Sequence, residues 1–285
     1  MWNKNVETFL CCNSDYERSS IVLYGAPFDG TVSFRPGARF GPSSMRHESY
    51  GLESYSPYLN KDLSDISVFD GGDLELGFGN PSRVLDEIEE KTDIIFSDGK
   101  LPFLLGGEHL ITLGAFRSAV KRYPGIMLLH LDAHADLRDK YLGEELSHAC
   151  VIRRCHELAG DGRIIQLGIR SGDRSEFEWS SQGHTEMHRF STDSLPEVIS
   201  RLTGRPVYLT VDLDILDPSV FPGTGTPEAG GISFEELRKA VTDICLNCSV
   251  VGCDVVELSP GYSPADISVL TGGKIVREML LALAH

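Results

Sequence analysis

Short runs of β-branched and aliphatic residues alternate along this chain with segments of helical spacing. Val84, Ile88 and Ile95 predict one helix, a capping box that begins at Ser233 predicts another, and apolar residues near the end of the chain predict a closing helix. Strands that alternate with helices form a parallel sheet covered on both faces. We therefore expect an α/β fold with three layers, αβα, around a mostly parallel central sheet. The expected strands are 21–24, 101–105, 126–131, 164–169, 207–211 and 250–256.

Five of these expected strands run directly into polar residues. In an open α/β sheet the ligand crevice lies outside the carboxyl ends of the strands. We therefore expect the five polar segments to converge at one edge of the sheet. They are 106–109 (Gly-Gly-Glu-His), 132–136 (Asp-Ala-His-Ala-Asp), 170–173 (Arg-Ser-Gly-Asp), 212–214 (Asp-Leu-Asp) and 257–260 (Glu-Leu-Ser-Pro).

Two of these segments have the composition of a metal site. On an extended chain, side chains alternate between faces, so Asp132, His134 and Asp136 can point the same way. Asp212 and Asp214 repeat the pattern. Carboxylates a few ångströms apart cannot all stay ionised without compensating cations. The sequence therefore predicts a site for two divalent ions.

Size and composition are those of an ordinary globular protein. The chain has 285 residues, of which 41% are hydrophobic and 24% charged. No linker or charge block divides it, so we expect one domain over residues 1–285, with residues 1–19 as an N-terminal extension. No apolar stretch is long enough to cross a bilayer, and residues 1–6 do not begin an export signal. These features predict a cytoplasmic protein without a membrane partner.

The net charge of −16 argues against a nucleic-acid partner, because binding to phosphates needs a basic surface. It favours a cationic small molecule, although solubility alone would also explain it. The seven cysteines are scattered without a disulfide pattern, and we expect free thiols. Cys245 and Cys248 form a lone CxxC at a predicted helix end, where helix packing is favoured over a zinc or redox role.

Taken in order, the motifs resemble the ureohydrolases, the family of arginases and agmatinases. Each motif is weak by itself, but the ordered set is specific, and the resemblance spans roughly residues 20–284. It is carried by the segments 106–109, 132–136, Asp212–Pro218, Pro222–Gly231 and Val256–Pro260.

This resemblance implies an arginase-like fold and two Mn(II) ions per subunit. One ion would be held by His109, Asp132, Asp136 and Asp212, and the other by Asp132, His134, Asp212 and Asp214, with Asp132 and Asp212 as bridges. An oxygen-rich shell with one imidazole per ion suits Mn(II), while zinc, iron, cobalt and nickel stay open. The alternative is that these residues only cap turns and helices.

Two nearby residues are not expected to bind metal. His130 lies one step deeper in its strand and matches no ligand position, so we expect a core or supporting role. Asp217 precedes a proline and is expected either to shape a turn or to make a hydrogen bond that supports a metal ligand.

The resemblance also implies three residues that act on a substrate. Glu257 would accept the N–H groups of a guanidinium ion in a charge-assisted pair. His148 resembles the family's proton-shuttle histidine, and imidazole exchanges protons near neutral pH. Thr226 matches a position beside the guanidinium-binding glutamate. A surface glutamate, a solvated loop histidine and a plain turn are the alternatives for these three residues.

Two loops separate this chain from the arginases. Residues 137–146 replace the Ser/Asn-rich loop of that branch, and Ser33–Pro42 and Glu228 also look like agmatinases. The expected reaction is hydrolysis of agmatine to putrescine and urea, in a polyamine pathway. Arginase, guanidinobutyrase and other guanidino-acid hydrolases are alternatives, as are a deacetylase of this fold and a non-catalytic metal-binding homologue. The resemblance further suggests a homotrimer or homohexamer.

Overall fold

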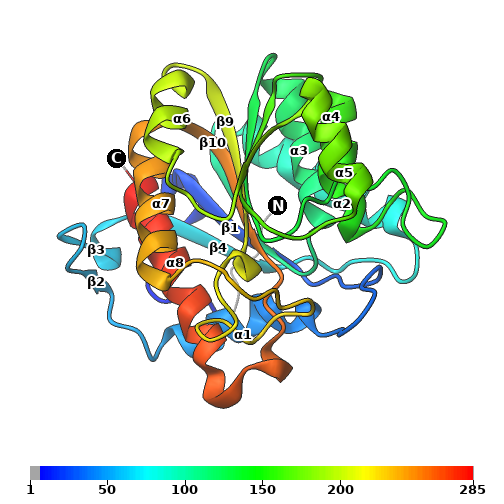
Figure 1. Ribbon diagram of the computed structural model, residues 1–285. Coiled ribbons are helices and arrows are strands. Elements are labelled where there is room, and N and C mark those ends of the chain that lie inside the picture. The colour runs from blue at the N-terminus through cyan, green and yellow to red at the C-terminus, as the bar shows by residue number, and fades with distance from the viewer. Residues whose placement is uncertain (1–6, 285) are drawn as a thin grey trace.

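A parallel sheet of eight strands forms the centre of the molecule (Figure 1). The computed structural model describes residues 7–284, so the segment on which the leader prediction rests lies outside it. The order across the sheet is β4-β1-β5-β10-β9-β6-β7-β8, and every neighbouring pair is parallel. The strands are β1 (Ile21–Ala26), β4 (Val68–Asp73), β5 (Leu101–Gly106), β6 (Met127–Leu131), β7 (Ile164–Ile169), β8 (Glu186–Arg189), β9 (Pro206–Asp212) and β10 (Ser249–Val256).

Helices cover both faces of this sheet (Figure 1). Alternation along the strands divides the apolar core in two: Ile21 and Leu23 of β1 pack on one side, Val22 and Tyr24 on the other. α2, α3 and α4 pack on the second side, and α1, α7 and α8 on the first. The three-layer αβα fold is thereby confirmed. The helices are α1 (Gly41–Ser49), α2 (Pro81–Ser97), α3 (Ile111–Arg122), α4 (Val151–Ala159), α5 (Arg174–Trp179), α6 (Leu195–Leu202), α7 (Phe234–Asn247) and α8 (Ile267–Leu283).

The six strands expected from aliphatic runs are all present, but two further strands of the sheet were not expected. β4 reads Val-Phe-Asp-Gly-Gly-Asp and β8 reads Glu-Met-His-Arg. Both lie at an edge of the sheet, where one side of the strand meets no neighbour and a continuous apolar run is unnecessary. A small antiparallel pair, β2 (Tyr55–Ser56) and β3 (Lys61–Asp62), lies outside the main sheet.

The capping box at Ser233 begins α7, as the sequence predicts. The Ser233 hydroxyl accepts a hydrogen bond from the backbone N–H of Glu236, and the Glu236 carboxylate accepts one from the backbone N–H of Ser233.

The cysteines are free thiols. Cys245 is buried in α7, and Cys248 caps its C-terminal end. None of the seven cysteines, all within residues 7–284, forms a disulfide. No helix in the described part of the chain has the length and apolarity to span a membrane.

The strand order explains how one edge of the sheet collects polar residues. The five strands that end in polar segments are contiguous, in the order β5-β10-β9-β6-β7. Because they are parallel, their carboxyl ends meet at one edge. This edge therefore brings together the segments 106–109, 257–260, 212–214, 132–136 and 170–173.

Close backbone packing fixes the first of these segments. The backbone N–H of Glu108 donates to Phe28 O at 2.8 Å, and the N–H of Glu257 donates to Gly107 O at 2.9 Å. A Cβ atom on Gly107 would lie 2.2 Å from Phe28 O and 2.6 Å from Ala26 O. Only glycine fits at position 107 without moving main-chain atoms.

The substitution Gly107→Ala should therefore destabilise the protein, by about 1–3 kcal/mol as for other overpacked sites. The matched control is Gly261→Ala, because nothing lies within 4 Å of a Cβ at that position. The control should change the free energy of unfolding by no more than about 0.5 kcal/mol. Urea unfolding followed by circular dichroism measures both. Equal stability of the two variants would contradict the packing argument.

Candidate metal centre and adjoining cavity

Six aspartate and histidine side chains meet at the carboxyl edge of the sheet. Asp132 follows β6, Asp212 ends β9, and both are almost completely buried. Five of the six predicted ligands fall into two groups of possible ligand atoms that share Asp132. One group contains His109, Asp132 and Asp136 together with His130, which was not predicted as a ligand, and the other contains Asp132, His134 and Asp214. Asp212 is in neither group, but its Oδ2 atom lies 3.4 Å from His109 Nδ1.

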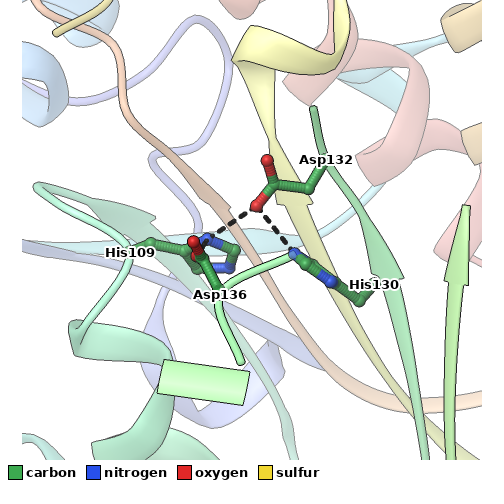
Figure 2. Close-up of side chains that lie close together, drawn as sticks. All are labelled: His109, His130, Asp132 and Asp136. Atoms are coloured by element: carbon green, nitrogen blue, oxygen red, sulfur yellow. Dashed lines mark hydrogen bonds and ion pairs between the residues drawn. The ribbon is translucent and has the colours of Figure 1, made fainter. Parts of the chain in front are cut away.

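His109 occupies the centre of the first group (Figure 2). Its Nδ1 atom lies 3.1 Å from Asp132 Oδ2, 3.0 Å from Asp136 Oδ2 and 3.4 Å from Asp212 Oδ2. Nevertheless Nδ1 is buried and has no hydrogen-bond partner among residues 7–284. Its Nε2 atom is 2.9 Å from Thr210 Oγ1, which fixes the ring with Nδ1 toward the carboxylates. This convergence of one nitrogen and three oxygens is the donor set of a cation site.

The second group lies on the other side of Asp132. His134 Nδ1 is 2.9 Å from Asp214 Oδ2 and 3.6 Å from Asp132 Oδ1. Asp214 Oδ2 is buried and, within the described chain, has no hydrogen-bond partner. Two unpartnered buried atoms, one in each group, therefore point to two cations rather than one.

Main-chain N–H groups hold the carboxylates in place. Asp132 Oδ1 accepts from the N–H of His134 at 2.6 Å, and Asp212 Oδ1 accepts from the N–H of Asp214 at 2.8 Å. Asp214 Oδ1 accepts from the N–H of Ala133 at 3.2 Å. In Asp212 and Asp214 the second oxygen is thus left to face the cluster.

Asp136 reaches the cluster in a way that strand alternation did not predict. β6 ends at Leu131, and Asp136 has a left-handed backbone with φ of 52°. Its carbonyl accepts from the N–H groups of Ile152 and Arg153 in the first turn of α4, at 3.1 and 3.2 Å. Contacts with α4 therefore turn the chain here, and the expectation of one extended segment from Asp132 to Asp136 is wrong.

The pKa values of these side chains are shifted, because several charged groups are buried close together. Burial, together with Asp214 and Asp132, raises the pKa of Asp212 well above its usual range. Burial and Asp132 also raise the pKa of Asp214, although His134 opposes the shift. Burial lowers the pKa of His109, but the three neighbouring carboxylates outweigh it and raise that pKa well above the ordinary value. Divalent cations would replace these protons, so the residues fit a binuclear centre.

His130 supports the cluster from below (Figure 2). Its Nε2 atom is 2.7 Å from Asp132 Oδ2, and its Nδ1 atom is 3.1 Å from the amide nitrogen of Gln166. Both ring nitrogens are therefore occupied, as the predicted core or supporting role requires. Asp217 shapes a turn, because Oδ2 accepts from the N–H of Gly230 at 2.9 Å and Oδ1 from that of Ser219 at 3.0 Å.

Glu257 lines a cavity that four members of the cluster, His109, His134, Asp136 and Asp212, also line. It also has a left-handed backbone, with φ of 65°, and its Oε1 atom accepts from the N–H of His109 at 2.7 Å. Burial, and next the carboxyl group of Glu108, raise its pKa to about 8. Such a buried carboxylate gains most from a neighbouring cation. Thr226 lines the same cavity.

His148 also lines the cavity, in the 3-10 helical turn His148–Cys150 that precedes α4. Burial lowers the pKa of its imidazole. Its backbone N–H donates to Thr31 Oγ1 at 3.1 Å, while Nδ1 is buried without a hydrogen-bond partner in the described residues. The Thr31 hydroxyl in turn donates to Glu108, a carboxylate whose pKa burial raises to about 7. A buried chain of contacts thus positions His148.

The cavity has a volume of about 210 Å³. This is below the roughly 300–1,000 Å³ of cavities that hold drug-sized ligands, so a small ligand is indicated. Among residues 7–284, Arg138 is the one guanidinium or ammonium group that lines it, and it pairs with Asp173. The lining carboxylates are Asp136, Asp173, Glu176, Asp212 and Glu257.

Sequence reasoning missed several residues that build the site. Thr31 and Glu108 were not singled out, although Glu108 lies inside the Gly-Gly-Glu-His motif. Arg170 follows β7 as expected, but its guanidinium donates to the carbonyls of Asp214 at 2.8 Å and Glu228 at 2.8 Å. Arg170 therefore ties together two loops around the site, and no local sequence signal distinguishes this role.

Known proteins with this sequence pattern form one family. A model of the arginase family matches residues 19–282. Agmatinase of Bacillus subtilis is 47% identical over 277 residues, which cover 96% of this chain and 96% of that protein. Guanidinobutyrase of Pseudomonas aeruginosa is 35% identical over 274 residues, which cover 92% of this chain and 86% of that protein. A crystal structure of a candidate agmatinase from Clostridium difficile has a TM-score of 0.93 and 47% identity, covering 95% of this chain and 99% of that chain. The chain therefore belongs to the arginase family.

Proposed function

We propose that this protein hydrolyses agmatine to putrescine and urea at a binuclear manganese centre. The observation that carries the proposal is the shared arrangement of the His/Asp cluster and Glu257 at the floor of a small acidic cavity. The relatives named agmatinase support the choice of substrate.

The proposed ligands are those expected from the sequence. His109, Asp132, Asp136 and Asp212 would hold one ion, and Asp132, His134, Asp212 and Asp214 the other. This assignment is supported by the unpartnered Nδ1 of His109 and Oδ2 of Asp214. When bound, the two ions would supply Lewis-acid activation of a water molecule at neutral pH.

Glu257 would bind the guanidinium end of the substrate. Its pKa of about 8 describes the carboxyl group without a cation beside it, and a guanidinium ion would favour the ionised form. Because Oε1 already accepts from His109, the orientation of the carboxylate is set before the substrate arrives. Thr226, which lines the same cavity, would complete this end of the substrate site.

His148 would carry protons between the reaction and solvent. Its lowered pKa keeps the imidazole neutral near pH 7, so that it can accept a proton and pass it to the leaving amine. Thr31 and Glu108 act as positioning residues, because they hold the main chain at His148.

The charge of the cavity favours agmatine over guanidino acids. The alkyl chain of agmatine ends in an ammonium group, whereas arginine and 4-guanidinobutyrate carry a carboxylate. Arg138 is paired with Asp173 and has little charge left to offer a carboxylate. The carboxylate of either acid would therefore face the acidic lining, and placing like charges together costs several kcal/mol. In arginine the α-ammonium group would offset part of this cost.

Urea release with Mn(II) tests the substrate. Agmatine should be hydrolysed with a kcat/KM at least about tenfold above that of arginine or 4-guanidinobutyrate, because like charges oppose the last two. Enzyme stripped of metal is the control and should release no urea. Faster turnover of arginine or 4-guanidinobutyrate would overturn the proposed substrate. Release of acetate from an acetylated amine would identify the deacetylase alternative, and metal binding without any turnover would identify a non-catalytic protein.

Two substitutions separate metal binding from proton transfer. Asp132→Asn should lower manganese affinity by at least about tenfold at both positions, because Asp132 belongs to both groups. His148→Ala should keep the full metal content and lower kcat by about 10²–10⁴-fold. Elemental analysis and urea release measure the two effects. His188→Ala is the control, since His188 pairs only with Glu186 away from the cavity. Loss of metal from His148→Ala would contradict the assigned role.

The cytoplasmic location, the role in polyamine biosynthesis and the trimeric or hexameric assembly implied by the family resemblance stay proposals. We also propose that residues 1–285 form one ureohydrolase domain.

A further inference from the structure

A second cluster of histidine and aspartate lies at the opposite edge of the sheet from the metal centre. His156 is in the last turn of α4, Asp161 precedes β7, and His184 precedes β8. The three residues thus lie near the amino ends of β7 and β8, whereas the predicted metal ligands lie at carboxyl ends. Nothing in the proposed reaction uses them.

The three side chains converge on one point. His156 Nε2 and His184 Nδ1 both lie 2.7 Å from the same atom, Asp161 Oδ1. The side chain of Asp161 is 65% exposed, while those of His156 and His184 are 14% and 29% exposed. The imidazoles are therefore held by the fold, and the carboxylate is the member that can rotate.

Trp179 at the end of α5 fixes both imidazoles. The His184 ring stacks on the indole at 4.4 Å with an interplanar angle of 18°, and the His156 ring meets it edge-on at 4.7 Å. The guanidinium of Arg153 lies over the indole, 3.9 Å from its centroid. Rings held in this way lose little freedom when they bind a ligand.

We propose that His156, Asp161 and His184 form a second, peripheral binding site for a zinc-class divalent transition metal ion. Two imidazole nitrogens and one carboxylate oxygen are ligands that Zn²⁺ accepts, at about 2.0–2.2 Å each, with a fourth position left for water. Ligand atoms of a tetrahedral site are then about 3.3 Å apart. The two contacts of 2.7 Å would need to open by about 0.6 Å.

Other exposed histidine–acid contacts do not have this arrangement. His47 pairs with Glu7, and His188 pairs with Glu186, so each offers one imidazole. In the described part of the chain, the peripheral cluster is the only group of three possible ligands that lies apart from Asp132. His188, whose side chain is 28% exposed against 29% for His184, therefore provides a matched control for non-specific binding at a half-buried histidine.

An ion at this site would join three separate segments. It would connect the end of α4 to the turn before β7 and to the connection between α5 and β8. Because the ion binds only the folded arrangement, it would raise the stability of this edge of the sheet.

Fluorescence of Trp179 reports on this site, because the indole contacts the rings of His156 and His184. The sequence has two tryptophans, so Trp2→Phe leaves Trp179 as the single emitter. The variant is first saturated with Mn(II) and then titrated with Co(II), a paramagnetic probe of zinc sites. We expect saturable quenching of Trp179 that excess Zn(II) prevents.

Substitutions at the ligands then decide the assignment. In the Trp2→Phe background, Asp161→Asn and His184→Asn should each shift the Co(II) midpoint at least about tenfold, while His188→Asn should not shift it. Asp161→Asn leaves the stack of His184 on Trp179 in place and so separates metal binding from loss of the ring contact. Urea release should stay unchanged in all of these variants. Absence of quenching in Trp2→Phe, or quenching with the same midpoint in Asp161→Asn, would overturn the proposal.

Discussion

Repulsion among buried carboxylates is the constraint on which this structure depends. Asp132, Asp212 and Asp214 are withdrawn from water at the carboxyl edge of the sheet, and this burial, followed by their mutual repulsion, raises the pKa values of Asp212 and Asp214. Such an arrangement is costly unless positive charge balances it. The imidazoles of His109 and His134 supply part of that charge. The unpartnered Nδ1 of His109 and Oδ2 of Asp214 indicate where cations would supply the rest.

The backbone gives this unfavourable cluster its geometry. Main-chain N–H groups donate to Asp132, Asp212 and Glu257, so each carboxylate is oriented by atoms that cannot rotate away. Left-handed backbone at Asp136 and Glu257 turns the carboxylates of these two residues toward the same space. Strain of this kind gathers at sites where the surrounding fold determines the conformation. The result is a set of charges whose positions are fixed before any ligand binds.

The two edges of the sheet carry different chemistry. At the carboxyl edge, oxygen ligands dominate and most of the groups are buried, which suits hard divalent cations. At the amino edge, His156 and His184 provide a nitrogen-rich, half-exposed cluster that is stacked against Trp179. Because the rigid sheet separates the clusters, a change at one edge need not disturb the other.

The sequence by itself determined the fold class, the six aliphatic strands and the segments that carry the His/Asp cluster. These are local signals: runs of aliphatic residues, capping residues and polar residues directly after a strand. Edge strands β4 and β8 lacked such signals, because an edge strand needs no continuous apolar run. Only the tertiary structure decided that α4 turns Asp136 toward His109, that Thr31 and Glu108 position His148, and that Arg170 joins two loops. Those contacts link residues far apart in the chain, so their pairing follows from how the layers pack and not from any local pattern.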